Sequence, residues 1–302
     1  MSLFSIMTHV ATLISAPTSP TVTAAVIDAA VARLGAAGTA TLAEGVATDV
    51  FVTLEPGTEK AVAEDLRAHL AAPIDAVVQK LAGRAKGLLI ADMDSTMIGQ
   101  ECIDELAAEV GLKDHIAAIT ERAMQGEIAF EPALRERVAL LAGLEANVVD
   151  RVIAERIHLT PGAVELVRTM RANGAWTALV SGGFTVFTGP VSRMIGFHEH
   201  RSNLLLEEAG KLTGRVAEPI LGQDAKRASL LELAAAKKVP MELTLAVGDG
   251  ANDLAMIHEA GLGVAYHAKP RVAAEAHARI DHADLTALLY IQGYRRAEFV
   301  HE

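Results

Sequence analysis

Residues able to do acid–base and electrostatic chemistry are grouped at four places in the last two thirds of the chain. Asp92 and Asp94 flank a single residue, so in an extended segment both carboxylates point to the same side. Two carboxylates this close repel each other unless a cation or a proton intervenes, and Asp249 would add a third. Mg²⁺ would resolve the repulsion, because it binds one or two carboxylates together with a substrate phosphate. The acidic residues therefore predict a magnesium site that handles a phosphate.

The remaining two groups could bind that phosphate. Ser181, followed by Gly182 and Gly183, offers a hydroxyl and amide donors on a flexible backbone, and Lys226 offers a positive charge. Phosphoryl transfer depends mainly on such positioning and charge stabilisation. Taken singly, each feature is more often structural, because acidic residues near glycine usually cap helices, Ser-Gly-Gly usually forms a turn, and a lone lysine is usually exposed. Their joint occurrence favours a phosphoryl-transfer site.

The elements predicted around these residues would bring them together. Apolar runs typical of buried parallel strands occur at 88–91, 177–180, 243–247 and 263–265. Each of the first three runs leads directly into one of the polar groups. Because ligands bind beyond the carboxyl ends of the strands in open α/β sheets, we expect the three groups to converge on one site.

The stretch 100–156 has a different pattern, with helical periodicity and no strand signal. Gly111, Gly126 and Gly143 divide it into four helical pieces. A helical insertion next to a catalytic strand end could serve as a lid over the site.

The amino-terminal part alternates short β-like runs with helical ones. In order, these are 10–14 (β), 23–34 (α), 39–43 (β), 50–54 (β), 59–70 (α) and 74–81 (β). The order βαββαβ is that of a small ferredoxin-like sheet, and a Pro56-Gly57 turn supports it. Residues 83–87 are expected to form a polar hinge before the main domain.

Composition narrows the choice of partner and of compartment. The 302 residues are 51% hydrophobic and carry a net charge of −11, which disfavours nucleic acid or an anionic membrane and favours a small-molecule partner. The single cysteine, Cys102, fits a reducing compartment and is expected to be a buried structural thiol. No basic leader or bilayer-spanning apolar run is present, so a soluble, cytoplasmic protein is expected.

Four segments resemble the motifs of the haloacid dehalogenase (HAD) superfamily of phosphatases. They are Asp92-Met93-Asp94-Ser95-Thr96, Ser181-Gly182-Gly183, Lys226, and Gly248-Asp249-Gly250-Ala251-Asn252-Asp253. From about residue 88 to 284 the chain is similar to the phosphoserine phosphatase family within it. The resemblance implies an α/β fold: a Rossmann-like core (85–99 and 158–302) and a helical cap (100–157), after an ACT-like amino-terminal domain (1–84).

The resemblance also implies a role for each site residue. Asp92 would be the nucleophile that becomes phosphorylated, and Asp94 would be the general acid and then the general base. Mg²⁺ would be held by the carboxylates of Asp92 and Asp249 and by the backbone carbonyl of Asp94, with Asp253 orienting this metal shell. The phosphate would be bound by Ser181, Gly182, Lys226 and Asn252.

Substrate choice is expected to lie in the cap. Arg137 falls three residues after Leu134 on an apolar helix face, and an arginine facing inward needs an anion. In the family, the positions of Glu101 and Arg137 bind the ammonium and carboxylate of phosphoserine, and those of Met124 and Phe130 line the pocket. The alternative is that Glu101 and Arg137 pair with each other as a structural salt bridge.

Two other functions remain open from the sequence. A phosphatase or phosphotransferase of the same superfamily acting on another small phosphate monoester would share every catalytic residue. An inactive, amino-acid-binding regulator is the second alternative, and the intact set of Asp92, Asp94, Lys226 and Asp249 argues against it. The amino-terminal domain could form a homodimer, bind an amino-acid effector, or be purely structural.

Overall fold

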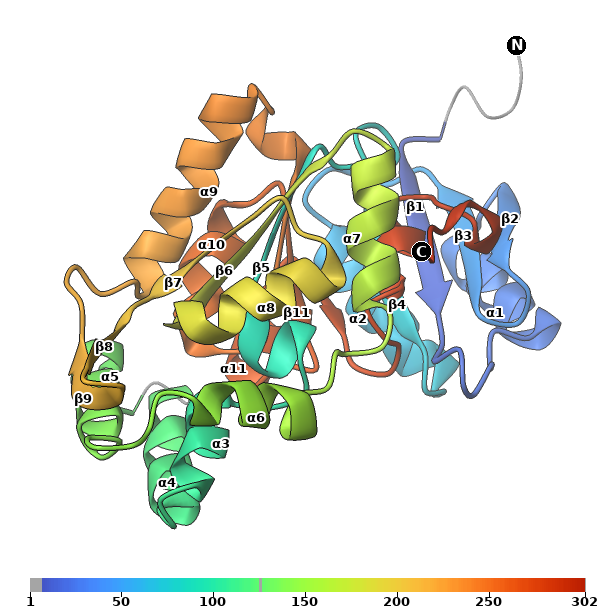
Figure 1. Cartoon of the computed structure of the whole chain (residues 1–302). Helices are drawn as coiled ribbons and strands as arrows, with labels where there is room; N and C mark the ends of the chain where they lie inside the picture. The colour runs from blue at the N-terminus through green and yellow to red at the C-terminus, as the bar shows by residue number, and fades with distance from the viewer. Residues whose placement is uncertain (1–6, 125–126, 302) are drawn as a thin grey trace.

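The computed structural model describes residues 7–124 and 127–301, and it contains two α/β units that lie side by side (Figure 1). The amino-terminal unit consists of β1 (His9–Ile14), α1 (Ala24–Leu34), β2 (Gly38–Ala43), β3 (Ala47–Val52), α2 (Glu59–Leu70) and β4 (Asp75–Lys80). Its strands pair antiparallel in the order β2-β3-β1-β4. Thr23 begins α1 by accepting a hydrogen bond from the Val26 N–H, and Gly35 ends it with a left-handed φ of 59°. The predicted βαββαβ unit is confirmed, and its arrangement is consistent with an ACT-like domain.

The main unit is built on a six-stranded parallel sheet with the order β12-β11-β10-β5-β6-β7. The strands are β5 (Leu88–Ala91), β6 (Trp176–Phe184), β7 (Glu199–Asn203), β10 (Thr244–Gly248), β11 (Leu262–Tyr266) and β12 (Ala278–Ile280). Side chains of β5 alternate between two hydrophobic clusters: Leu89 and Ala91 belong to one, and Leu88 and Ile90 to the other. The strand reads as one apolar run because both of its faces are buried.

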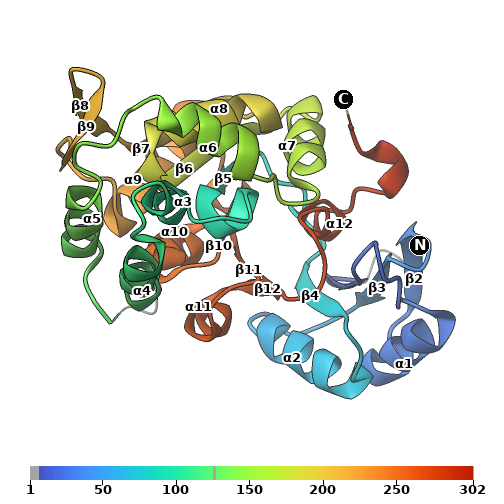
Figure 2. The same cartoon turned by 60° about the horizontal axis from the view of Figure 1, so that its bottom comes forward.

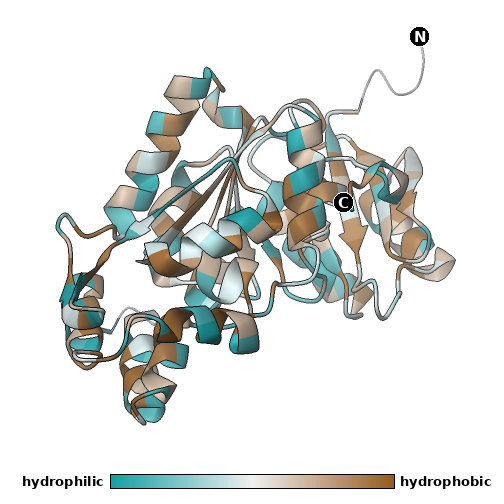
Figure 3. Cartoon of the chain, viewed as in Figure 1, coloured by the Kyte–Doolittle hydropathy of each residue, from teal (hydrophilic) through white to brown (hydrophobic). Residues whose placement is uncertain are grey.

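Helices cover both faces of this sheet. One cluster contains residues of α7 (Ala163–Ala172), α8 (Thr185–Ile195) and α12 (Ala287–Ile291), and the other contains residues of α9 (Gln223–Lys237) and α10 (Leu254–Glu259). The shorter α11 (Pro270–Glu275) packs in a smaller cluster with α10. Figure 3 shows mostly hydrophobic strands between helices that carry hydrophilic residues. Within the described ranges, no helix has the length and apolar character needed to cross a bilayer.

The predicted helical insertion is confirmed between β5 and α7 (Figure 2). It contains α3 (Cys102–Ala108), α4 (Lys113–Met124), α5 (Phe130–Ala139) and α6 (Val148–Arg156). Gly111 and Gly143 separate successive helices with left-handed φ angles of 72° and 84°, whereas Gly126 lies outside the described residues. A hairpin of β8 (Leu205–Glu208) and β9 (Lys211–Val216) contacts this cap, because Gly214 packs against Ala142.

The structure differs from the sequence-based expectation in three strands. β6 does not end at Val180 but continues through Ser181 to Phe184, with a shift of its pairing to β7. β7 was not predicted because Glu199, His200 and Arg201 give it no apolar pattern at the edge of the sheet. β12 is only three residues long and gives no periodic signal.

The two units are joined by buried hydrogen bonds and ion pairs. Asp75, at the start of β4, is fully buried and accepts hydrogen bonds from the backbone N–H groups of residues 281, 282 and 283 at 2.7, 3.2 and 2.9 Å. The Arg84 guanidinium lies 2.6 Å from an Asp49 carboxylate oxygen and also donates to the backbone oxygens of Tyr290 and Ile291. Arg84, expected to lie in a polar hinge, therefore bridges both units.

Candidate active site

Three strand ends of the main sheet meet at one cavity of about 290 Å³ beneath the cap. Of the residues predicted for the site, those that line this cavity are Asp92, Asp94, Glu101, Phe130, Arg137, Ser181, Gly182 and Asn252. Lys226, Asp249 and Asp253 are buried directly beside them. The side chain of Met124 lies outside the described residues. The expected convergence of the polar groups therefore occurs, and the cap supplies the opposite wall.

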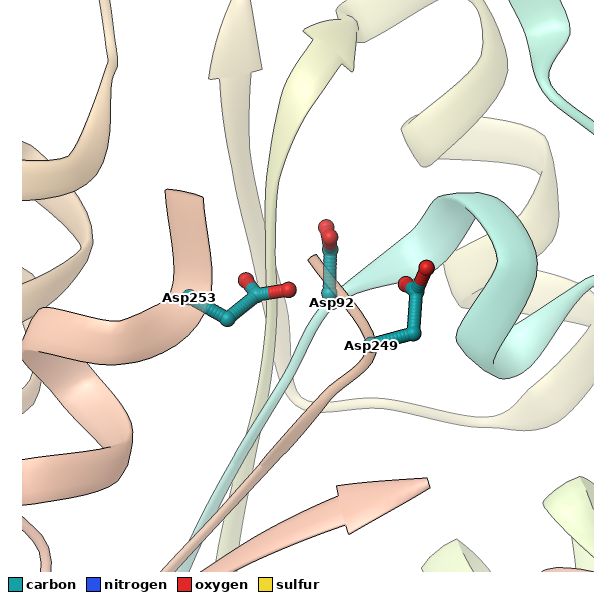
Figure 4. A group of neighbouring side chains, drawn as sticks. All are labelled: Asp92, Asp249 and Asp253. Carbon is teal, nitrogen blue, oxygen red and sulfur yellow. The ribbon is translucent and has the colours of Figure 1, made fainter. Parts of the chain in front are cut away.

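Carboxylates from two strand ends form the floor of the site. Oxygens of Asp92, Asp249 and Asp253 all lie within 4.8 Å of one another, and Figure 4 shows Asp92 and Asp249 pointing the same way while Asp253 reaches toward them. Lys226 is fully buried, and its Nζ lies 2.8 Å from Asp92 Oδ1 and 2.6 Å from Asp253 Oδ1. Thr96 donates a hydrogen bond of 3.1 Å to Asp249. One lysine therefore faces three carboxylates.

This excess of negative charge appears in the pKa values. Burial, followed by the charges of Asp253 and Asp92, raises the pKa of Asp249 well above its ordinary range. Burial and Asp92 raise the pKa of Asp253 to about 7, with Lys226 acting in the opposite direction. Burial lowers the pKa of Lys226, but Asp253 and Asp92 outweigh it and raise that pKa. The donor set fits a divalent cation, since its candidate ligands are oxygens and their charge exceeds that of the lysine.

Asp94 is set for proton transfer rather than for charge pairing. The chain leaves β5 after Ala91 and turns, so that Asp94 Oδ1 accepts a hydrogen bond of 3.1 Å from the Cys102 N–H. Burial, with a contribution from Asp92, raises the pKa of Asp94 to about 6. A carboxyl group with such a pKa can give up and take back a proton near neutral pH. Cys102 itself is a free, buried cysteine, as expected.

Gly182 and Gly183 allow close approaches of neighbouring side chains. A Cβ atom on Gly183 would lie 2.8 Å from Asp94 Oδ2, and one on Gly182 would lie 2.7 Å from the Phe130 ring. Ser181 is buried, and its Oγ accepts a hydrogen bond of 2.9 Å from the Gly183 N–H. The glycines thus let the backbone reach both the acid and the cap.

The cap places Glu101 and Arg137 in the cavity wall. Arg137 is only 5% exposed; its Nη1 donates to Thr120 Oγ1 at 2.9 Å and its Nε donates to the Ala133 carbonyl at 3.1 Å. Glu101 accepts a hydrogen bond of 2.6 Å from Ser95 Oγ. The ion pairs found within 7–124 and 127–301 do not join Glu101 with Arg137, so the geometry does not favour the structural salt bridge.

Sequence reasoning missed Ser95 and Thr120 as parts of this site. Ser95 stands inside the first motif, but its sequence position does not reveal that its hydroxyl turns toward Glu101. Thr120 lines the cavity and falls four residues after the buried Ile116, so helical periodicity could have placed it on the inner face of α4.

Comparison with known proteins agrees with this geometry. Residues 89–258 match the family model of haloacid dehalogenase-like hydrolases. A phosphoserine phosphatase from Streptomyces coelicolor is 45% identical over 76% of this chain, but the match spans only 56% of that relative. A probable phosphoserine phosphatase from Vibrio cholerae has a structure with a TM-score of 0.74, at 32% identity over 97% of this chain and 88% of that one.

A second solved structure is a phospho-aspartyl intermediate analogue of phosphoserine phosphatase. It has a TM-score of 0.65 at 38% identity, and the likeness covers 68% of this chain and 98% of that one. The family match includes all four motifs in full and extends over more than half of the sequence. The chain therefore belongs to the haloacid dehalogenase-like hydrolase family, within the group of the phosphoserine phosphatases.

Proposed function

We propose that this protein is a magnesium-dependent phosphoserine phosphatase, which hydrolyses O-phospho-L-serine to L-serine and phosphate, the final step of serine biosynthesis. The observation that carries the proposal is a single cavity that is lined on one side by residues at the strand ends and on the other by charged residues of the cap. Asp92, Asp94 and Ser181 form its floor at the strand ends, while Glu101 and Arg137 face it from the cap. A phosphate ester that bears both an ammonium group and a carboxylate matches these charges.

Asp92 would attack the phosphorus atom. Its Oδ1 already lies near two donors, Lys226 Nζ at 2.8 Å and the Met93 N–H at 2.8 Å, so Oδ2 is the oxygen available for the attack. A bond forms between Oδ2 and phosphorus while the bond from phosphorus to the seryl oxygen breaks, and Asp94 gives that oxygen its proton. Asp94 then takes a proton from water as the water oxygen bonds to phosphorus and the bond between phosphorus and Asp92 Oδ2 breaks, which releases phosphate and restores the Asp92 carboxylate.

The transferred phosphoryl group would be held by Lys226, Ser181, the Gly182 backbone and Asn252. Mg²⁺ would be held by the carboxylates of Asp92 and Asp249 and by the Asp94 backbone carbonyl, and it would offset the charge of the phosphate. We assign Asp253 to orientation rather than ligation, because Oδ1 is bound to Lys226 and Oδ2 accepts the Gly250 N–H at 3.1 Å.

The cap would bind the part of the substrate that does not react, its carboxylate and ammonium groups. Arg137 would bind the carboxylate, for which its planar guanidinium is suited, and Glu101 would bind the ammonium group. Phe130 and Met124 would line the space between them. A cytoplasmic location, a homodimer, an amino-acid effector at the amino-terminal unit and the predicted domain boundaries remain predictions from the sequence.

The deciding experiment measures phosphate release from O-phospho-L-serine with Mg²⁺ and with a chelator, and compares this substrate with p-nitrophenyl phosphate. We expect turnover only with the metal and a strong preference for phosphoserine. Mass spectrometry after a rapid acid quench should find phosphate on Asp92. Full activity after verified metal removal would refute the metal assignment, and a preference for esters without either charged group would refute the substrate.

A further inference from the structure

We propose that two hydroxyl groups, those of Ser95 and Thr120, position the two side chains that select the substrate. Ser95 would hold Glu101, and Thr120 would hold Arg137. The proposal rests on the proposed function, because it takes Glu101 as the partner of the ammonium group and Arg137 as the partner of the carboxylate.

Ser95 occupies a backbone conformation that is unfavourable for a residue with a side chain. Its φ of 53° and ψ of 5° lie in the left-handed region, where glycine would avoid the steric cost. Its N–H donates to the Gln100 carbonyl at 3.2 Å, and its Oγ donates to Glu101 Oε1 at 2.6 Å. This conformation therefore places the hydroxyl on Glu101, a bond that glycine could not make.

Thr120 links Arg137 to a carboxylate. Its Oγ1 accepts the Arg137 Nη1–H at 2.9 Å and lies 2.9 Å from Asp104 Oδ1. The hydroxyl carries one proton, which it gives best to a carboxylate, so Asp104 orients Thr120 and Thr120 orients the guanidinium. The Ala133 carbonyl holds Nε at 3.1 Å, and neither bond uses Nη2. The guanidinium is thus fixed, and no hydrogen bond from the described residues occupies Nη2, which is left for an anion.

A neutral hydroxyl positions a charged group without neutralising it. An acidic partner on Arg137, or a basic one on Glu101, would compete with the substrate for the same charge. Thr120 is buried at 4% exposure and Arg137 at 5%, so water does not replace these bonds easily. Fixing both side chains before the substrate arrives lowers the entropy lost on binding.

The test measures kcat and KM of the full-length enzyme on four phosphate esters. O-phospho-L-serine carries both charged groups, phosphoethanolamine only the ammonium, O-phospho-3-hydroxypropionate only the carboxylate, and p-nitrophenyl phosphate neither. Thr120→Val should lower kcat/KM on the order of ten-fold for the two esters with a carboxylate, mostly through KM, and much less for the others. Ser95→Ala should do the same for the two esters with an ammonium group. Thr120→Ser, which keeps the hydroxyl, should restore activity.

Several variants separate positioning from folding. Ser95→Gly removes the hydroxyl together with the backbone cost, so it should show the same ammonium-selective loss as Ser95→Ala. Thr120→Ala replaces Thr120→Val if the latter does not fold. Thr169→Val is the matched control. It also removes a buried hydroxyl, one that accepts a hydrogen bond of 2.8 Å from the Val300 N–H, but Thr169 does not line the catalytic cavity.

The outcomes distinguish this proposal from the proposed function. Equal losses on all four esters, or an unchanged enzyme, would overturn the positioning roles of Ser95 and Thr120. A wild-type enzyme that does not prefer phosphoserine would instead overturn the proposed substrate. Charge-selective losses against a wild type that prefers phosphoserine would support both.

Discussion

The catalytic pocket and the interface between the two units both bury acidic groups, but they treat them differently. At the interface, Asp75 receives three backbone N–H groups, and Asp49 is bound by Arg84 and by the Thr12 hydroxyl at 2.8 Å. In the pocket, three carboxylates lie together, and the one lysine beside them, Lys226, pairs with two of them, Asp92 and Asp253. At the interface, other groups of the chain therefore supply enough hydrogen-bond donors and positive charge for each buried carboxylate. In the pocket, the carboxylates outnumber the positive charges beside them.

This difference distinguishes buried carboxylates that stabilise the fold from those that form a ligand site. A buried carboxylate with several donors contributes to one fixed arrangement, and removing it leaves the donors unpaired. A cluster with too few donors costs folding free energy, which shows as the raised pKa of Asp249. Because such a cluster is relieved only by protons or by a bound cation, the imbalance marks the place where ligands belong.

The largest effect should come from the pocket and concern activity alone. Asp92→Asn removes the proposed nucleophile, so turnover of phosphoserine should fall by roughly four orders of magnitude or more, and no phosphate adduct should form. The midpoint of thermal unfolding should change little, because the substitution removes one of several mutually repelling charges and so offsets the loss of the ion pair with Lys226. Steady-state kinetics and rapid-quench mass spectrometry check the first result, and calorimetry the second. A severe loss of stability would contradict the comparison.

The interface should give the opposite pattern. Asp75→Ala leaves the N–H groups of residues 281–283 without their acceptor in a buried place, so unfolding free energy should fall by about 3–5 kcal/mol. Turnover per folded molecule should remain close to that of the wild type, because Asp75 does not line the catalytic cavity. Denaturant unfolding with active-site titration checks both values. Asp28→Ala, at an exposed position of α1, is a suitable control.

Removing a proposed metal ligand should reverse the usual sign of a buried substitution. Asp249→Asn relieves repulsion in the metal-free protein, so in a chelator its unfolding free energy should rise by about 1–2 kcal/mol. Added Mg²⁺ should stabilise the wild type but not the variant. Thermal shift at several Mg²⁺ concentrations measures both. A variant that is less stable in the chelator and still responds to Mg²⁺ would show that the cluster is not overcharged.

The smallest effect concerns a lysine near the interface. Lys86 Nζ donates to the carbonyls of Gly83 at 3.0 Å and Glu242 at 2.8 Å, and burial lowers the pKa of Lys86 to about 8. Above that pH the folded protein holds fewer protons here than the unfolded chain, so stability should rise between about pH 8 and 10.5. Lys86→Met should flatten this rise, whereas Lys80→Met should not. Denaturant unfolding across this pH range measures the slopes.

Local patterns in the sequence predicted most of the framework. Period-two and helical signals identified the βαββαβ unit, the central strands of the main sheet and the cap helices, because each depends on neighbours in the chain. Arg137 was placed on a buried helix face by its spacing from Leu134, and it is buried. The polar edge strand β7 escaped prediction because it leaves no apolar period. Thr120 was overlooked although it follows the buried Ile116 by one helical turn, because a threonine does not by itself signal that its hydroxyl contacts Arg137.

The sequence by itself determined which side chains could do chemistry and which strand ends carry them. Only the tertiary structure decided which buried charges are matched. Asp75 and the N–H groups of 281–283 are more than 200 positions apart, and Lys226 on α9 meets Asp92 at the end of β5. Such partners depend on how the layers pack, which local periodicity does not encode. A carboxylate therefore becomes structural or catalytic through the donors that folding brings to it.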